Sequence, residues 1–194
     1  APVVTPAVHD WVMQHVIYPT VQGMAAEGQV YTGFLYAGLM IAPDGTAKVL
    51  EFNCRFGDPE TQPIMLRLKS DLVELCAAAC AGKLDSMQID FDSRAAVGVV
   101  LAAGGYPDDY RKGDVISGLP TDDNREAKVF HAGTVLKDGQ VLTAGGRVLC
   151  ATALGVNVTA AQQAAYQLVD QIHWDGVFSR RDIGYRAVAR EKQQ

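Results

Sequence analysis

The tetrapeptide Ala42-Pro43-Asp44-Gly45 separates two stretches rich in apolar and aromatic residues, 31–41 and 47–53. Proline suits the second position of a β-turn because its φ is fixed, and glycine tolerates the positive φ that many turns require. A short turn between two strands makes them run antiparallel. The sequence therefore predicts a β-hairpin over 31–53, and with it an antiparallel sheet.

Helices are predicted on both sides of this hairpin. Thr5-Pro6 indicates a helix start, because a capping hydroxyl is followed by proline at the first helical position. Pro19 is expected to kink or end that helix. Ser70-Asp71 predicts the start of a second, alanine-rich helix over 72–81, which Gly82 ends.

The second half of the chain has a different sequence pattern, typical of short β-strands. After an apolar strand candidate at 95–103, short strand candidates alternate with glycine-containing turns as far as residue 154. One helix is predicted over 159–172, capped by Thr159 and with a buried stripe made of Ala160, Ala164, Leu168 and Ile172. We therefore predict an α+β fold with two parts: a helix-and-hairpin part at 1–92 and a β-rich part with a helix at 93–194.

Composition excludes several classes of protein. The net charge of -5 argues against a nucleic-acid partner, and a hydrophobic content of 48% argues against disorder. No apolar run is long enough to cross a bilayer, so no membrane partner is expected. The four cysteines form no C-x-x-C pair, and a reducing cytoplasm is the expected location.

The segment from Glu51 to Gln62 carries the chemistry. Because strand side chains alternate, Glu51, Asn53 and Arg55 are expected on one face and the apolar residues between them on the other. Glu and Asn offer the hard oxygen ligands that Mg²⁺ accepts, and Arg pairs well with a phosphate or carboxylate. The alternative interpretation of this row is a solvated polar strand face.

The run EFNCRFGDPETQ at 51–62 resembles the signature of the glycinamide ribonucleotide synthetase (phosphoribosylamine–glycine ligase) family, within the ATP-grasp superfamily. Further segments resemble the same family, in order along the chain: YTGFLYAGLM at 31–40, AAGGYP at 102–107, VFHAGT at 129–134, GGRVL at 145–149 and SRRDIG at 179–184. The resemblance therefore extends over nearly the whole chain. It implies that the first part is a portion of an ATP-grasp domain.

The resemblance implies roles for particular residues. Glu51 and Asn53 match the Mg²⁺ (or Mn²⁺) ligands beside the ATP phosphates, and Arg55 matches a catalytic group that stabilises transferring phosphoryl or substrate charge. Asp58 and Gln62 match positions at the substrate, although Asp58 has an alternative interpretation as a helix cap.

Three further residues are candidates for ligand contacts. Leu39 or Met40 could form the floor of the adenine site, or either could be an ordinary core residue. Many ATP-grasp enzymes carry a second acidic metal ligand on the preceding strand, and residues 37–40 hold no carboxylate. In the β-rich part, Arg147 is a candidate for binding a phosphate of the substrate.

The implied reaction joins glycine to 5-phosphoribosylamine in purine biosynthesis, through a glycyl phosphate, with ATP converted to ADP and phosphate. No glycine-rich loop with lysines and no preceding α/β domain is evident, so we expect a C-terminal portion of the enzyme. Its partner would be the N-terminal part, and the chain alone is expected to be inactive. The alternatives are a non-catalytic module that binds a nucleotide or a partner, and another ATP-grasp carboxylate–amine ligase.

Overall fold

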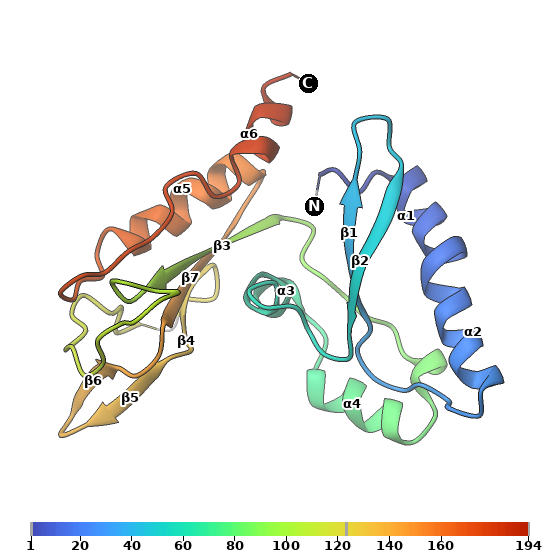
Figure 1. The fold of residues 1–194 in the computed structure, drawn as a ribbon, viewed down its shortest axis with the longest axis horizontal. Helices are drawn as coiled ribbons and strands as arrows, with labels where there is room; N and C mark the ends of the chain where they lie inside the picture. The colour runs from blue at the N-terminus through green and yellow to red at the C-terminus, as the bar shows by residue number, and fades with distance from the viewer. Residues whose placement is uncertain (1, 123, 194) are drawn as a thin grey trace. The chain divides into compact units, whose positions relative to one another are not determined.

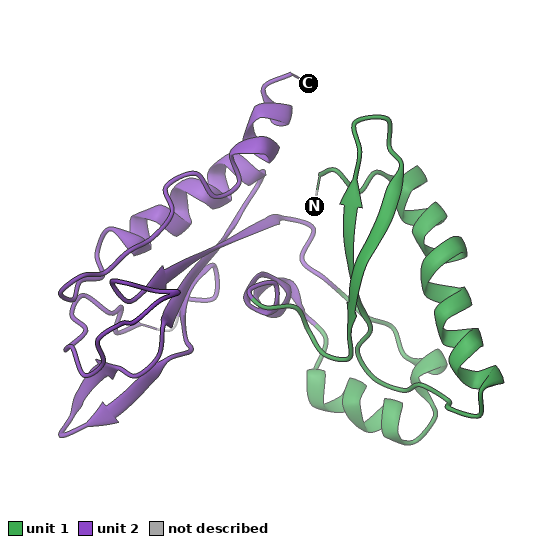
Figure 2. Cartoon of the chain, viewed as in Figure 1, with its two compact units in different colours: residues 1–58, 70–90 green, residues 59–69, 91–194 purple. Residues whose placement is uncertain are grey.

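A computed structural model describes residues 2–122 and 124–193 (Figure 1). The chain forms two compact units (Figure 2): unit 1 is Ala1–Asp58 with Ser70–Asp90, and unit 2 is Pro59–Lys69 with Phe91–Gln194. The predicted domain boundary after residue 92 stays a prediction. The units differ from it mainly in residues 59–69, which belong to unit 2 although they come before that boundary.

Unit 1 begins with three consecutive helical segments, α1 (Pro6–Val12), η1 (Met13–Ile17) and α2 (Tyr18–Ala26). The predicted start is confirmed, because the Thr5 hydroxyl accepts a hydrogen bond from the Val8 amide at 3.3 Å. Pro19 does not end the helical run but stands in the first turn of α2, where its missing amide hydrogen costs no helical hydrogen bond. The segment before it widens into a π-helix, which accommodates a residue without an amide hydrogen.

The predicted hairpin is confirmed, although its first strand begins at Tyr36 and not at Tyr31. Strands β1 (Tyr36–Ile41) and β2 (Ala47–Asn53) pair antiparallel across the turn at 42–45. One face of the hairpin packs on the first helices in a small core of Val8, Val12, Val16, Ile17, Ala37, Leu39, Ile41 and Ala47. Unit 1 also holds α4 (Leu72–Cys80), capped as predicted by Asp71, and the short 3-10 helix η2 (Leu84–Ser86).

A β-bulge interrupts the hairpin at Leu50. Gly38 pairs with Glu51, but the next residue of β1, Leu39, pairs with Val49. Leu50 is therefore the extra residue of β2 and has no paired residue on β1. An extra residue in one strand reverses the alternation of its side chains beyond that point. Glu51 therefore lies on the face of the hairpin that does not carry the helix-packed residues Leu39 and Ala47.

Unit 2 is built on a three-stranded antiparallel sheet in the order β3 (Ala95–Ala102), β7 (Arg147–Gly155), β4 (Ala127–His131). A second hairpin joins β5 (Thr134–Lys137) to β6 (Gln140–Thr143). The helices of this unit are α3 (Thr61–Arg67), α5 (Val158–Val169) and α6 (Tyr185–Glu191), and α5 runs along the sheet (Figure 1).

The helix α5 differs in two details from the prediction. Its cap is Asn157, whose side chain accepts from the Ala160 amide at 2.8 Å, whereas the Thr159 hydroxyl donates to Glu191. The most buried row is one residue later than predicted and consists of Ala161, Ala165 and Val169, followed by Ile172. The helical spacing of the buried residues is therefore as predicted, but the buried row is shifted by one residue. The sheet determines which row of the helix is covered, and the helix sequence alone does not show where the sheet lies.

Several glycines of unit 2 allow another part of the chain to lie directly against their backbone. A Cβ on Gly146 would lie 2.2 Å from the Tyr106 ring, and one on Gly104 would lie 2.8 Å from the Gly176 carbonyl oxygen. The glycine pairs at 104–105 and 145–146 therefore pack the loops of the sheet together, which agrees with their interpretation as turns. Among the described residues, no helix is both long enough and apolar enough to span a membrane.

Candidate functional site

Glu51 and Asn53 converge at the end of β2. The Asn53 amide nitrogen donates a hydrogen bond to Glu51 Oε1 at 3.0 Å, and Glu51 is exposed while Asn53 is half-buried. Rotation of the Asn53 amide by half a turn would present its oxygen in place of the nitrogen. Two hard oxygen donors would then meet at one exposed point, and this donor set fits Mg²⁺ when phosphate and water oxygens complete the shell.

The bulge determines which other residues share the face of Glu51 and Asn53. Directly opposite residues of an antiparallel pair lie on the same face. Glu51 is opposite Gly38, and Asn53 is opposite Tyr36. On the other side of the bulge, the same face carries the pair Met40 and Lys48. We call these six residues the ligand face of the hairpin.

The two candidates for the adenine floor are separated by this arrangement. Leu39 packs into the small core against the helices, on the opposite face of the hairpin from Glu51. Met40 lies on the ligand face and is 58% exposed. Of the two, therefore, only Met40 is placed to contact a ligand bound at Glu51.

The reverse face of β2 is apolar and lies near the helix α2. Phe52 and Cys54 line a pocket of about 190 Å³ together with Thr20, Val21, Met24, Tyr31 and Leu35. Loss of hydration and the neighbouring Cys54 thiol raise the pKa of Tyr31. These side chains are only partly covered, since Phe52 is 43% exposed, so they form the wall of a pocket and not a closed core.

Arg55 lies just beyond the strand. β2 ends at Asn53, and Arg55 stands in the bend that follows, so strict strand alternation does not extend to it. Its Nη1 donates to the Phe56 carbonyl oxygen at 2.8 Å, and the Phe56 ring packs against Phe34 at a tilt of 33°, with centroids 4.0 Å apart. The guanidinium is thus held at the turn that follows the two candidate metal ligands.

The turn after Arg55 leads into α3. This helix begins at Thr61 with Glu60 in the N-cap position, and Asp58 lies two residues before that position. Gln62, in the first turn of α3 and in unit 2, has a buried Oε1 for which the described residues offer no hydrogen-bond donor. A buried acceptor without a donor is costly, and a ligand with an N–H or O–H group would satisfy it.

Arg147 opens strand β7 of unit 2, where it pairs with Ala102 and is exposed. Glu51, Asn53, Arg55 and Asp58 belong to unit 1, whereas Gln62 and Arg147 belong to unit 2. The structure thus brings together the two candidate metal ligands and places Met40 on their face. Sequence reasoning missed Gly38 and Lys48, because nothing in the sequence marks the bulge that places them there.

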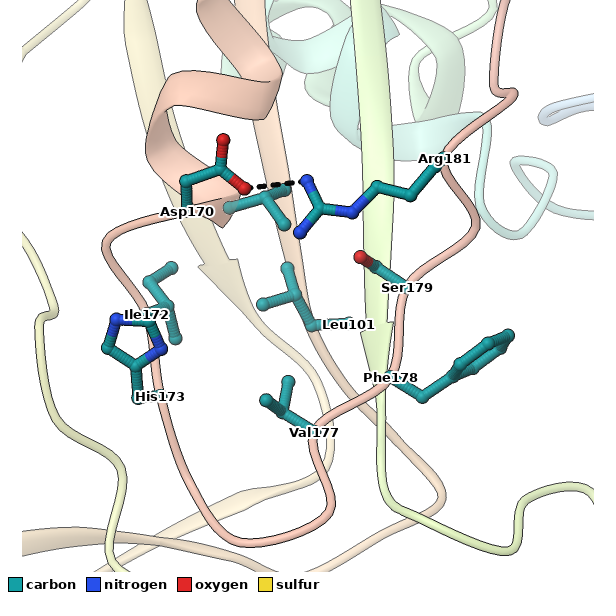
Figure 3. A pocket seen from close by; sticks show the side chains of 9 residues that line it. Leu101, Asp170, Ile172, His173, Val177, Phe178, Ser179 and Arg181 are labelled. Carbon is teal, nitrogen blue, oxygen red and sulfur yellow. Dashed lines mark hydrogen bonds and ion pairs between the residues drawn. The ribbon is translucent and has the colours of Figure 1, made fainter.

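A separate pocket of about 240 Å³ lies in unit 2 (Figure 3). Its floor is apolar, with Leu101, Ile172 and Val177, and its rim carries the ion pair between Arg181 Nη1 and Asp170 Oδ1 at 2.6 Å. No predicted site residue lines this pocket. Within 2–122 and 124–193, no three His, Cys, Asp or Glu side chains gather as a metal site, so Glu51 and Asn53 stand as a two-residue donor set.

Comparisons with known proteins agree with the family resemblance. The family described as "Phosphoribosylglycinamide synthetase, ATP-grasp (A) domain" matches residues 1–61, and "Phosphoribosylglycinamide synthetase, C domain" matches residues 96–186. A phosphoribosylamine–glycine ligase of Vibrio cholerae is 71% identical over 99% of this chain and 45% of its own length. One from Haemophilus influenzae is 66% identical over 100% and 45%. The chain thus spans about half the length of the curated relatives it matches.

Solved structures show the same relationship. The crystal structure of phosphoribosylamine–glycine ligase from Thermotoga maritima matches 94% of this chain and 45% of its own, with a TM-score of 0.81 and 37% identity. The biotin carboxylase domain of a Hydrogenobacter thermophilus 2-oxoglutarate carboxylase matches 91% of this chain and 38% of its own, with a TM-score of 0.60 at 16% identity. The second likeness concerns the fold alone. The predicted fold class, α+β with a portion of an ATP-grasp domain, is confirmed.

Proposed function

The chain belongs to the phosphoribosylglycinamide synthetase family, and on that premise we propose that it supplies the metal-binding part of an enzyme that ligates glycine to 5-phosphoribosylamine. The proposal assigns Mg²⁺, or Mn²⁺, to Glu51 and Asn53 beside the phosphates of ATP. The observation that carries it is the convergence of these two side chains, 3.0 Å apart, on an exposed strand end.

The residues of the chain suit phosphoryl transfer, which asks a protein mainly for positioning and for neutralisation of charge. Glu51 offers a carboxylate and Asn53 a neutral oxygen to the cation. When bound, the cation would neutralise charge on the phosphate oxygens. Arg55, held at the following turn, would stabilise negative charge on the transferring phosphoryl group or on glycine.

The proposed chemistry has two steps. A carboxylate oxygen of glycine attacks the γ-phosphorus of ATP, and ADP leaves. The amine nitrogen of phosphoribosylamine then attacks the carbonyl carbon of the glycyl phosphate, phosphate leaves, and the nitrogen loses a proton. The amide of glycinamide ribonucleotide is the product. No side chain is required as a nucleophile in this scheme, which suits a site made of metal ligands and an arginine.

The other candidate contacts have unequal support. Met40 is proposed at the adenine, supported by its exposure on the ligand face, and Leu39 is left out because it packs on the helices. Gln62 is proposed as a substrate contact, supported by its buried acceptor without a donor. Asp58 and Arg147 are proposed at the substrate from the family resemblance alone.

The remaining ligands of the nucleotide are proposed to come from the part of the enzyme that the relatives carry beyond the matched 45%. That part, with ATP, glycine and phosphoribosylamine, completes the set of proposed partners. A cytoplasmic location is proposed for the assembly, in keeping with cysteines that form no disulfide among the described residues.

A chimaera tests this function. This chain replaces the matching segment of the Vibrio cholerae ligase, and glycine-dependent and phosphoribosylamine-dependent ADP release is measured. We expect an active, Mg²⁺-dependent enzyme, and Glu51→Gln should lower its turnover by about 100-fold or more because it removes the anionic ligand that would hold the cation at the phosphates. Glu27→Gln is the matched control, an exposed glutamate at the end of α2 that should leave turnover unchanged.

Each of three other outcomes would contradict a different part of the proposed function. Normal turnover of the Glu51→Gln chimaera would remove the metal assignment. An active chimaera that ignores glycine but joins another carboxylate to an amine would indicate a different ATP-grasp ligase. A folded chimaera that binds MgATP without turnover would indicate a non-catalytic nucleotide-binding module.

A further inference from the structure

Gly38 lies directly against the side chain of Glu51. The two residues are paired across the hairpin, and Gly38 is buried although it stands on the exposed ligand face. A Cβ built on Gly38 would lie 3.1 Å from Glu51 Cγ, and 3.6 Å from both the Glu51 carbonyl oxygen and Tyr36 Cε1. The Glu51 side chain therefore lies close over the Cα of Gly38.

We propose that Gly38 is a positioning residue for the Glu51 carboxylate: the missing side chain leaves the space in which Glu51 lies flat on the strand pair and reaches Asn53. This inference rests on the proposed metal-binding role of Glu51 and Asn53. It concerns a residue that has no side chain with which to bind the metal.

Position 38 requires a glycine because there is no space for a side chain, and not because of its backbone conformation. Gly38 is absent from the glycines with positive φ, so an L-residue could adopt its backbone. The obstacle to a larger residue is the contact of 3.1 Å with Glu51 Cγ, which is closer than most real Cβ contacts. An alanine at this position would therefore push the Glu51 side chain away from the strand.

The direction in which the Glu51 side chain moves determines whether folding stability or metal binding is weakened. Glu51 is exposed, so its side chain can swing into solvent at little cost to folding. A swing that separates its carboxylate from Asn53, now 3.0 Å away, breaks the convergence of the two ligands. A substitution of Gly38 should therefore weaken metal binding while leaving the fold stable.

The bulge prevents an easy alternative. Leu50 fixes the register in which Glu51 faces Gly38, and a slip by one residue would turn Glu51 to the helix-packed face. Glu51 cannot move along the strand to make room, so only its side chain torsions can respond. These torsions have discrete staggered wells, so the carboxylate would be displaced by a rotamer change and not by a small drift.

The test uses the chimaera described above with Gly38→Ala and Gly38→Val. Mn²⁺ affinity in the presence of ATP is measured by electron paramagnetic resonance, on protein shown by circular dichroism to be folded. Residues that orient metal ligands typically contribute a factor of 10 to 100 in affinity, so we expect roughly a 10-fold loss for alanine and more for valine. The urea midpoint and the metal-free affinity for ATP should stay at their wild-type values.

Gly23→Ala is the matched control, because a Cβ on Gly23 in α2 would meet nothing within 4 Å. Wild-type Mn²⁺ affinity in both Gly38 variants would overturn the inference, provided that Glu51→Gln still weakens binding. If Glu51→Gln itself leaves Mn²⁺ affinity unchanged, the proposed metal site is wrong and the failure lies there. A loss of ATP affinity without metal would also overturn the inference, since it would show a general disturbance of the hairpin.

Discussion

The docking of α5 on the sheet of unit 2 depends on Gly155, the last residue of β7. A Cβ on this glycine would lie 2.2 Å from the backbone nitrogen of Ala161 and 2.7 Å from the carbonyl carbon of Ala160. Backbone atoms of a helix cannot rotate aside as a side chain can. Gly155→Ala should therefore force the helix to retreat by about 1 Å to restore ordinary contact.

The cost of this retreat follows from what the helix buries. Ala161 and Ala165 are fully buried and Val169 is 4% exposed, all of them against the sheet. A gap of 0.5 to 1 Å forfeits roughly a quarter to a half of the dispersion energy of each contact. Overpacking of this kind costs about 1 to 3 kcal/mol, and the rigid backbone obstacle places Gly155→Ala at about 3 kcal/mol.

Urea unfolding of this chain measures the effect. Trp174 is 7% exposed in the same core, so its fluorescence follows unit 2, and Trp11→Phe removes the second tryptophan of the chain. For a slope of about 2 kcal/mol per molar urea, the midpoint should fall by about 1.5 M. Val156→Ala is the control, since Val156 is 84% exposed and should change stability by less than about 0.5 kcal/mol. An unchanged midpoint for Gly155→Ala would refute the argument from close approach.

Two further predictions concern helix ends. The Thr159 hydroxyl and the amides of Val158 and Thr159 bind the Glu191 carboxylate and lower its pKa, so its stabilising effect is present above the pKa of the unfolded chain and disappears as the pH falls through the folded one. The stability gap between wild type and Glu191→Gln should therefore shrink between pH 6 and pH 3, and a constant gap in urea midpoint would contradict this. Asp71 accepts from the Val73 amide at 2.7 Å as the cap of α4. Asp71→Ala should cost about 1 kcal/mol and speed hydrogen exchange of the α4 amides about fivefold, whereas Asp71→Asn should leave exchange nearly unchanged.

Local signals in the sequence predicted much of the fold. The turn at 42–45 gave the hairpin, and the capping residues Thr5 and Asp71 marked helix starts correctly, because turns and caps depend on a few neighbouring residues. The cap of α5 was assigned to Thr159 where Asn157 provides it. Both residues are good caps, and the Thr159 hydroxyl is engaged by Glu191, which lies far along the chain and cannot be seen locally.

The candidate site was predictable to a similar extent. Alternation placed Glu51 and Asn53 on one face, and their hydrogen bond agrees with that placement. Arg55 could not be placed by the same argument, because the strand ends at Asn53 and the chain bends. The position of Leu39 depends on strand pairing, so the sequence alone could not separate it from Met40.

The bulge at Leu50 divides β2 into two segments with opposite phases. Before it, the odd-numbered residues Ala47 and Val49 face the helices; after it, the even-numbered Phe52 does so. Deletion of Leu50 would restore one continuous phase and leave Glu51 opposite Gly38, because Val49 and Glu51 already pair with the consecutive residues Leu39 and Gly38. A regular ladder that kept Leu50 as a paired residue would instead turn Glu51 and Asn53 toward the helices. In evolutionary terms, we expect relatives either to keep the extra residue as a bulge or to lack it altogether.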